Sequence, residues 1–295
     1  MRTTLIADGS IDLGVGHQVR MSTLAEALVG RGHTVELLCR ELPGSAHGWA
    51  WSSLNHRVLP ATTPVEELMR MATGDWIVVD HYGMRGERLA GRMGGRLLLV
   101  QDLVEGPVQA DLLLNQNLGV APSDYPPGSL VGAQYALVRA AFRGRRWSAG
   151  GGVLLMCGGT DHLGLLPGLV ELLAATMPGR QLHVVGGPVA PPHCVHHRSL
   201  PAADMASLMA ECDLAVLAAG STVYEALTVG IPFVGIQTAD NQHAIAIGLR
   251  KIGVPVVTPE SLHLLPGILA DLRPPPLVLD GLGAERVVGA MERSA

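Results

Sequence analysis

The fold of this chain is decided by the stretch Ala7-Asp-Gly-Ser-Ile-Asp-Leu-Gly-Val-Gly-His-Gln-Val-Arg20. It follows a short apolar strand at residues 3–6 and precedes residues 18–29, where apolar side chains recur with the period of a helix. The glycines of the turn let the backbone approach a ligand closely, because glycine has no Cβ. His17 stands at the helix start, where free N–H groups favour an anion, and histidine can move protons near neutral pH. The stretch therefore predicts a strand–turn–helix unit that carries a candidate functional histidine.

The composition indicates a chain with large apolar cores and few charges. Hydrophobic residues make up 48% of the 295 residues and aromatic residues only 3%, so Leu, Val, Ala and Met must build the cores. The formal net charge is −5, which argues against nucleic acid as a partner, because phosphate binding needs clustered Lys and Arg. The length favours two domains over one large α/β domain.

We expect no leader, no membrane span and no disulfide framework in this chain. The opening apolar run stops at Asp8, and no uninterrupted apolar run is long enough to cross a bilayer. The four cysteines are widely spaced, which indicates small buried residues in a reducing compartment. We therefore expect a soluble cytoplasmic protein, with a monomer favoured.

Strand and helix patterns alternate in both halves of the chain, which predicts parallel sheets with right-handed crossovers. In the first half we expect strands at residues 3–6, 34–39, 76–80, 96–102 and 111–115, and helices at residues 18–29, 64–71 and 86–93. In the second half we expect strands at residues 153–156, 181–185, 214–218 and 233–237, and helices at residues 163–175, 202–210, 223–229, 241–252 and 285–293.

The halves are separated by an irregular stretch at residues 116–134 and an arginine-rich one at residues 139–152, which we interpret as a solvated linker. The predicted fold class is α/β, with two doubly wound Rossmann-like domains. Residues 1–143 form the domain that carries the histidine, and residues 150–295 form a ligand-binding domain whose last helix can pack back on the first. Ligands bind at the carboxyl ends of parallel strands, so a cleft between the two sheets is the expected site.

Polar residues follow the predicted strands of the first half. Asp80 and Tyr82 lie in the run Asp-His-Tyr-Gly at one strand end, and Asp102 ends the next strand. An aspartate at such a position can orient a histidine or bind a sugar hydroxyl. A tight turn with a helix-capping histidine and a capping aspartate would explain these residues without a function.

The second half has three similar turns. Gly158-Gly-Thr-Asp161 offers backbone N–H groups near a helix start. In Ala219-Gly-Ser-Thr-Val-Tyr-Glu225, Ser221 or Thr222 can cap a helix, its N–H groups can bind a pyrophosphate, and Glu225 is within reach of a ribose diol. Thr238-Ala-Asp-Asn-Gln242 is suited to sugar hydroxyls. Ordinary turns and a capping-box glutamate are the alternatives.

Several other signatures are missing from the sequence. The histidine-rich run at residues 191–197 lacks a second ligand group at zinc-finger spacing. The chain has no Asp-x-Asp pair, no dinucleotide fingerprint, no Walker loop and no Gly-x-Ser-x-Gly elbow. We therefore expect neither a metal site nor a cofactor.

Taken together and in order, these stretches resemble the UDP-sugar hydrolase of pseudaminic acid biosynthesis and its spore-coat polysaccharide relatives. The residues that carry the resemblance are Asp8, Ser10, Gly14-Val-Gly-His17 and Arg20; Asp80-His-Tyr-Gly83; Asp111-Leu-Leu-Leu-Asn115; Tyr135-Ala-Leu-Val-Arg139; Gly158-Gly-Thr-Asp161; Ala219-Gly-Ser-Thr-Val-Tyr-Glu225; and Gln237-Thr-Ala-Asp-Asn-Gln242. That family is similar to the glycosyltransferase of lipid II synthesis and has the two-domain GT-B fold.

The resemblance implies a metal-independent enzyme in which water replaces UDP at the anomeric carbon of an amino-deoxy sugar, with inversion. It implies His17 as the catalytic base that activates this water. The residues expected to bind the nucleotide sugar are Asp8, Gly14, Gly16, Arg20, Asp80, Tyr82, Asp102, Gly159, Thr160, Asp161, Gly220, Ser221, Thr222, Glu225, Asp240, Asn241 and Gln242. The alternatives are a GT-B glycosyltransferase that gives the sugar to an acceptor, and a nucleotide-binding module without catalysis.

Overall fold

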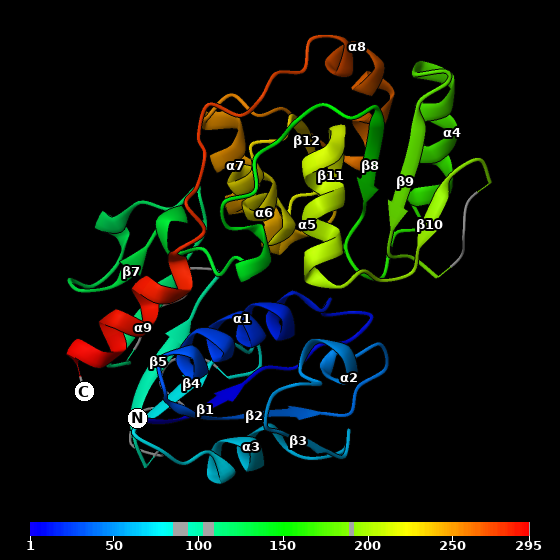
Figure 1. Ribbon diagram of the computed structural model, residues 1–295. Coiled ribbons are helices and arrows are strands. Elements are labelled where there is room, and N and C mark those ends of the chain that lie inside the picture. The colour runs from blue at the N-terminus through cyan, green and yellow to red at the C-terminus, as the bar shows by residue number, and fades with distance from the viewer. Residues whose placement is uncertain (85–93, 103–108, 189–191, 295) are drawn as a thin grey trace. The chain divides into compact units, whose positions relative to one another are not determined.

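The structure is a computed structural model that describes residues 1–84, 94–102, 109–188 and 192–294. The helix predicted at residues 86–93 lies outside these ranges. The chain divides into two compact units (Figure 1). Unit 1 comprises Met1–Leu137 and Leu282–Ala295, and unit 2 comprises Val138–Gly281. The division between the units thus falls before residue 138 rather than at residues 143–150, and the last helix belongs to unit 1.

Unit 1 is built on a parallel sheet whose described strands run in the order β3-β2-β1-β4-β5-β6-β7. These strands are β1 (Arg2–Ile6), β2 (Thr34–Arg40), β3 (His56–Leu59), β4 (Trp76–Val79), β5 (Arg96–Val100), β6 (Leu112–Asn115) and β7 (Leu130–Val131). The central strands are apolar along their length because helices cover both faces of the sheet. The strand order reverses between β1 and β4, where such sheets bind their ligands.

Helices from both ends of the chain cover one face of this sheet. Helix α1 (Gly16–Gly30) and helix α9 (Gly283–Arg293) lie side by side, blue and red in Figure 1. Their apolar residues, among them Leu24 and Val287, form one core with the strands. Helix α3 (Val65–Met71) belongs to the core on the other face.

Unit 2 repeats the same plan. Its described strands run in the order β10-β9-β8-β11-β12-β13, all parallel. They are β8 (Gly152–Met156), β9 (Gln181–Val185), β10 (Val195–His197), β11 (Cys212–Ala218), β12 (Phe233–Ile236) and β13 (Val256–Val257). The helices are α4 (Leu166–Thr176), α5 (Ala202–Glu211), α6 (Thr222–Val229), α7 (His243–Lys251) and α8 (Leu265–Ala270). The strand order reverses between β8 and β11.

Short elements are where the structure differs from the sequence pattern. The prediction omitted β3, β7, β10, β13, α2 (His47–Ala50) and α8, since a segment of two to six residues has too few positions to show a period. Several 3₁₀ turns were also not expected; they are η2 (Pro122–Asp124), η3 (Ala133–Tyr135), η4 (Ala140–Phe142) and η6 (Pro259–Leu264). The helix predicted at residues 241–252 begins with a further 3₁₀ turn, η5 (Asp240–Gln242), before α7. Helix α4 begins at Leu166 rather than at residue 163, where Asp161 accepts the backbone N–H groups of Leu165 and Leu166.

The arginine-rich stretch is part of unit 2, so the prediction of a linker is wrong, although Arg145 and Arg146 are exposed to solvent as expected. Arg139 forms an ion pair with Glu225, and Arg143 donates a hydrogen bond from Nε to the carbonyl of Gly281 at 2.9 Å. The indole of Trp147 donates to the carbonyl of Cys212. These contacts fasten the start of unit 2 to its own sheet and helices.

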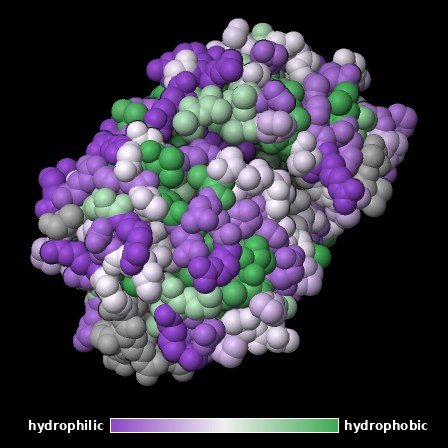
Figure 2. All heavy atoms as spheres, turned by 60° about the horizontal axis from the view of Figure 1, so that its bottom comes forward, coloured by the Kyte–Doolittle hydropathy of each residue, from purple (hydrophilic) through white to green (hydrophobic). Residues whose placement is uncertain are grey.

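The surface mixes apolar and polar residues. On the face shown in Figure 2, hydrophobic patches are interspersed with hydrophilic ones. In the part of the chain that the structure describes, no helix is both long enough and apolar enough to cross a membrane.

The contact between α9 and the rest of unit 1 can be tested at its first residue. A Cβ at Gly283 would lie 2.0 Å from the carbonyl oxygen of Ala136, so Gly283→Ala forces two backbone segments apart. We expect it to destabilise unit 1 by about 1–3 kcal/mol in chemical unfolding followed by circular dichroism. Gly267→Ala in α8 is the matched control, since no described atom lies within 4 Å of that Cβ position. Equal effects of the two variants would contradict the close approach.

Candidate functional site

The site in unit 1 lies where β1, β4 and β5 end. The parallel register pairs Ile6 with Val79, and Val79 with Leu99, so the residues after these strands share one edge of the sheet. Asp80 follows β4 directly and Asp102 lies just beyond β5. Helix α1 begins at the same edge because the turn before it, with Gly14 at φ 74°, reverses the chain after β1.

A hydrogen bond between His17 and Asp80 determines the state of the imidazole. Nδ1 of His17 lies 2.6 Å from Oδ1 of Asp80, and both side chains are buried. Nη2 of Arg20 also lies 3.0 Å from Nδ1, but the contact with Asp80 is the shorter one, and a carboxylate can only accept, so Nδ1 is assigned as the donor. In the neutral imidazole this leaves the lone pair on Nε2. The ring of Tyr82 stands edge-on to the imidazole, with 4.5 Å between centroids, and keeps it in place. His17 therefore has the tautomer of a general base.

Arg20 joins the two aspartates of this edge. Its Nε and Nη2 donate to Asp80, and its Nη1 donates to Asp102 at 2.8 Å. Burial alone would raise the pKa of both carboxyl groups, but the charge of Arg20 outweighs it and holds each pKa below its usual range. Asp80 therefore stays ionised beside His17.

These side chains surround a small cavity of about 40 Å³. The volume has room for about three water molecules, or for one hydroxyl group of a larger ligand. The residues that line it are His17, Arg20, Asp80, His81, Tyr82, Met84, Leu99, Val100, Gln101 and Asp102. Four predicted binding residues and the predicted base are thus brought together.

Asp8, which we expected at the ligand, is engaged by two neighbouring side chains. Its Oδ2 accepts from Nε of Arg40 at 2.7 Å and from Nε2 of His81 at 2.9 Å, and its Oδ1 accepts from the Arg40 backbone. Burial opposes its ionisation, but these hydrogen bonds lower the pKa of Asp8. Asp8 positions His81, which lines the cavity. Sequence reasoning missed Arg40, because nothing in the strand that carries it distinguishes it from a surface residue.

A buried run of amides supports the same edge from β6, and of its residues only Asn115 was part of a motif noted in the sequence. Asn117 donates from Nδ2 to the backbone carbonyl of Asp102 at 3.0 Å, while its own N–H donates to Asn115. Asn115 in turn donates to the hydroxyl of Tyr125 at 2.6 Å. All three amide and hydroxyl groups form hydrogen bonds, so the run holds the backbone at Asp102 in place. The signal that could have revealed this run is the sequence Asn115-Gln116-Asn117, three polar residues at the end of an apolar strand.

In unit 2 the ends of β8, β11 and β12 also share one edge, since Leu217 pairs with Met156 and Ala218 with Ile236. The loop after β8 contains the predicted residues Gly159, Thr160 and Asp161, and it turns at Gly158 with φ 77°. Both carboxylate oxygens of Asp161 accept backbone N–H groups at the start of α4. Asp161 therefore shapes the loop, and Gly159 and Thr160 remain its candidate ligand contacts.

The loop after β11 leads into α6. Neither Ser221 nor Thr222 caps this helix with its side chain, so the prediction of a cap is wrong, and Thr222 lies close to the sulfur of Met156 instead. Glu225 is buried in the first turn of α6. Glu225 does not form the capping box considered above. Arg139 instead donates to both of its carboxylate oxygens, from Nε at 2.6 Å and from Nη2 at 3.0 Å.

The Arg139 guanidinium also lies over the ring of Phe142, at 5.1 Å from its centroid. These two contacts hold the Glu225 carboxylate in one orientation, with lone pairs left for two hydroxyl groups. Arg139 appears in the sequence motif, but its partner 86 positions away could not be derived from it.

The turn after β12 holds the last group of predicted residues. The amide of Gln242 exchanges hydrogen bonds with Thr238 and closes the turn, with Thr238 N–H to Oε1 at 2.8 Å. Asp240 is exposed and Asn241 is half-buried. Gln242 thus shapes the turn while Asp240 is open to a ligand.

The histidine-rich run is partly described, and its last residues form β10 at the sheet edge. His197 stacks on His183 with 5.6 Å between ring centroids. Among the described residues, no group of three or more His, Cys, Asp or Glu side chains is placed to hold a metal ion.

The two parallel sheets, each with helices on both faces and polar residues at the strand-order reversal, define the GT-B fold of glycosyltransferases. MurG of Acinetobacter baumannii matches with a TM-score of 0.63 and 16% identity, over 99% of each chain. The spinosyn rhamnosyltransferase SpnG, solved with spinosyn aglycone, matches with a TM-score of 0.61 and 17% identity, over 100% of this chain and 97% of its own. SpnG has also been solved with thymidine diphosphate.

In sequence the chain is similar to the spore coat polysaccharide biosynthesis protein SpsG of Bacillus subtilis (strain 168). The two are 24% identical over 277 residues, which cover 83% of this chain and 80% of SpsG. No family profile matches the chain. The resemblance to spore-coat polysaccharide proteins is therefore confirmed at the level of a distant relative.

The comparison corrects the predicted reaction. Several of the matching structures are named as glycosyltransferases, among them SsfS6 of Streptomyces sp. SF2575, the rhamnosyltransferase SpnG and the forosaminyltransferase SpnP. None of these names supports the hydrolysis of a UDP-sugar, and that prediction is wrong. The resemblance misled because the two reactions share a nucleotide-sugar site and differ only in the second reactant.

The paired charges of Arg20 and Asp80 make unit 1 sensitive to acid. The folded pKa of Asp80 lies below its unfolded value of about 4, so its contribution is complete above pH 4 and is lost as the pH falls below it. We expect Asp80→Asn to lower the free energy of unfolding at neutral pH by about 3 kcal/mol. We also expect it to flatten the acid limb, which is the part of the curve of unfolding free energy against pH that lies below about pH 4. Urea titrations at a series of pH values measure both effects.

Asp124→Asn is the control for this prediction, since Asp124 is exposed on η2 of the same unit. It should leave the acid limb unchanged. An acid limb that is as steep in Asp80→Asn as in the wild type would refute the assignment.

Proposed function

We propose that the chain is a glycosyltransferase that moves a sugar from a nucleoside diphosphate to an acceptor hydroxyl group. The observation that carries the proposal is the hydrogen bond between Nδ1 of His17 and Asp80, at the lip of a cavity with room for one hydroxyl. The GT-B fold and the glycosyltransferase neighbours support it. The spore-coat polysaccharide relative supports an acceptor that belongs to a polysaccharide or its precursor.

In this proposal unit 1 supplies the base. An acceptor hydroxyl is a weak nucleophile until its proton is removed as it attacks. Nε2 of His17 takes that proton, and the ionised Asp80 stabilises the imidazolium that forms. Tyr82 and Arg20 hold the pair in place and do not exchange protons themselves. With a base and no second nucleophile in the step, attack occurs from the face opposite the leaving group and inverts the anomeric carbon.

Unit 2 holds the nucleotide in the same proposal. The leaving diphosphate gains negative charge as the glycosidic bond breaks, and backbone N–H groups at residues 219–222 and the start of α6 stabilise it. Glu225 accepts hydrogen bonds from the ribose hydroxyls, in the orientation that Arg139 imposes. The thymidine diphosphate bound to SpnG supports a nucleoside diphosphate donor.

The proposal is tested by following nucleoside diphosphate release from a panel of nucleotide sugars, with and without saccharide acceptors. We expect release to depend on an acceptor and to be accompanied by a glycosylated product. Equal release with and without acceptors, in the absence of glycosylated product, would contradict a transferase.

His17→Gln should lower kcat by about 10²- to 10⁴-fold, because the base is lost while the nucleotide site remains. The donor Kd, measured by calorimetry, should stay within about twofold, since a base acts on the barrier rather than on donor binding. His263→Gln, an exposed histidine on η6, is the control and should leave both quantities unchanged. A parallel loss of donor affinity in His17→Gln would assign His17 to binding instead.

Glu225→Gln should weaken UDP or TDP binding by about tenfold, because a charged acceptor of the ribose hydroxyls is replaced by a neutral one. Arg139→Lys keeps the charge but loses the two-pronged contact, so it should weaken nucleotide binding by a smaller factor. Glu171→Gln, which alters an exposed carboxylate on α4, is the control. If the nucleotide Kd is the same in all four proteins, Glu225 does not bind the ribose.

A further inference from the structure

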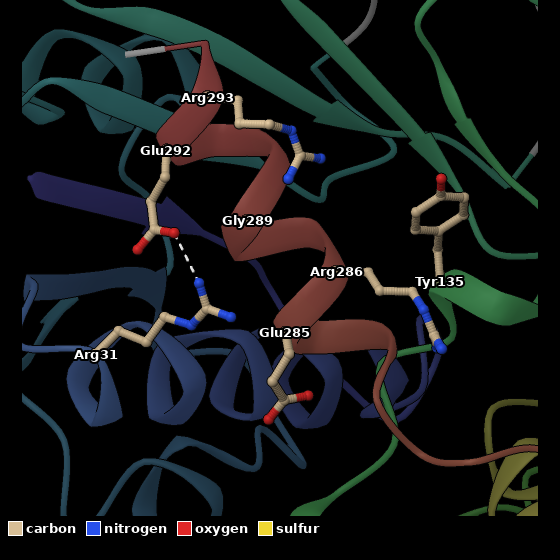
Figure 3. Close-up of a pocket in the computed structure, with 7 residues that line it drawn as sticks. All are labelled: Arg31, Tyr135, Glu285, Arg286, Gly289, Glu292 and Arg293. Atoms are coloured by element: carbon tan, nitrogen blue, oxygen red, sulfur yellow. Dashed lines mark hydrogen bonds and ion pairs between the residues drawn. The ribbon is translucent and has the colours of Figure 1, made fainter.

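A second hollow lies on unit 1 between α9, the end of α1 and η3, and it shares no residue with the His17 cavity (Figure 3). Its volume is about 420 Å³, which is in the range of small-molecule sites. The residues that line it, called here the α9 hollow, are Arg31, Tyr135, Glu285, Arg286, Gly289, Glu292 and Arg293.

The charges of the α9 hollow do not cancel. Three arginines face two glutamates, and Glu292 is shared between Arg31, at 2.7 Å, and His33, at 2.9 Å. The side chain of Arg293 forms no hydrogen bond or ion pair with the residues that the structure describes. The hollow therefore has one guanidinium in excess, which is available to a ligand.

Two of the guanidinium groups converge on one point of α9. A Cβ built at Gly289 would lie 3.4 Å from Nη1 of Arg293 and 3.9 Å from Nη1 of Arg31. Two positive charges thus approach the same stretch of backbone, which has no side chain at Gly289. A glycine in the middle of a helix lowers the stability of that helix by about 1 kcal/mol relative to alanine. An anion placed over Gly289 offsets the repulsion and receives both guanidinium groups.

We propose that the α9 hollow binds the phosphate group of a small ligand over Gly289, with Arg31 and Arg293 as its donors. Guanidinium groups suit phosphate because their N–H groups match pairs of phosphate oxygens. Tyr135, drawn at the far side of the hollow in Figure 3, provides an aromatic wall for the remainder of the ligand. The phosphate belongs to a soluble metabolite or to a lipid headgroup, since both present the same oxygens.

Inorganic phosphate is the first probe, and the backbone amide of Gly289 in an NMR titration of the full chain is the readout. This amide reports on the α9 hollow alone, so phosphate that binds to the nucleotide loops of unit 2 does not interfere. Sodium chloride of equal ionic strength separates binding from screening. We expect a saturable shift with phosphate and none with chloride.

The variants Arg293→Gln and Arg31→Gln should each weaken phosphate binding by about tenfold. Gly289→Leu fills the space between the two guanidinium groups with a good helix former, so it should abolish the binding while α9 remains folded. Arg57→Gln is the matched control, because Arg57 forms an exposed ion pair with Glu36 in the same unit, and phosphate binding should be unchanged.

Sedimentation with phosphatidylglycerol and phosphatidylcholine vesicles distinguishes the two sources. If the protein sediments with phosphatidylglycerol vesicles but not with phosphatidylcholine vesicles, and Arg293→Gln abolishes this, the ligand is a lipid headgroup. A Gly289 response to phosphate without vesicle binding supports a soluble ligand. If the Gly289 amide does not respond to phosphate, or if the backbone amide at position 289 responds equally in wild type, Arg293→Gln and Gly289→Leu, the proposal is overturned.

Discussion

The arrangement of unit 1 depends on one buried cation, Arg20, held between Asp80 and Asp102. Three buried charges are expensive to remove from water, and they remain only because every member is paired. The cluster has one net negative charge while His17 is neutral. In the proposed reaction His17 takes up a proton next to this cluster, which also orients its imidazole. Structure and proposed chemistry thus rest on the same four side chains.

In unit 2 a single ion pair, between Arg139 and Glu225, holds the corresponding polar side chain in place. Arg139 and Glu225 come from the first segment of the unit and from α6, and their contact ties this segment to the loop proposed to hold the diphosphate. In both units the polar residues stand where the strand order reverses, because neighbouring loops diverge there and leave space above the sheet edge. A repeated architecture thus positions the residues of the two proposed roles, proton transfer in one unit and nucleotide binding in the other.

The sequence predicts the long elements and the residues at the strand ends, since apolar periodicity and turn composition are local signals. It does not predict the short edge strands β3, β7, β10 and β13, which lack enough residues to show a period. Nor does it predict contacts such as Arg40 with Asp8 or Arg139 with Glu225, because these depend on how distant segments meet. The reaction was wrongly predicted for a different reason, since a base that activates water and a base that activates an acceptor hydroxyl need the same residues.

The central claim is a direct displacement assisted by His17, in which the acceptor oxygen replaces the nucleoside diphosphate. The most direct measurement is the anomeric configuration of the glycosylated product, followed by proton NMR from the start of the reaction with a donor of known configuration. The account predicts a product of inverted configuration from the first turnover. A product that retains the configuration of the donor would contradict it.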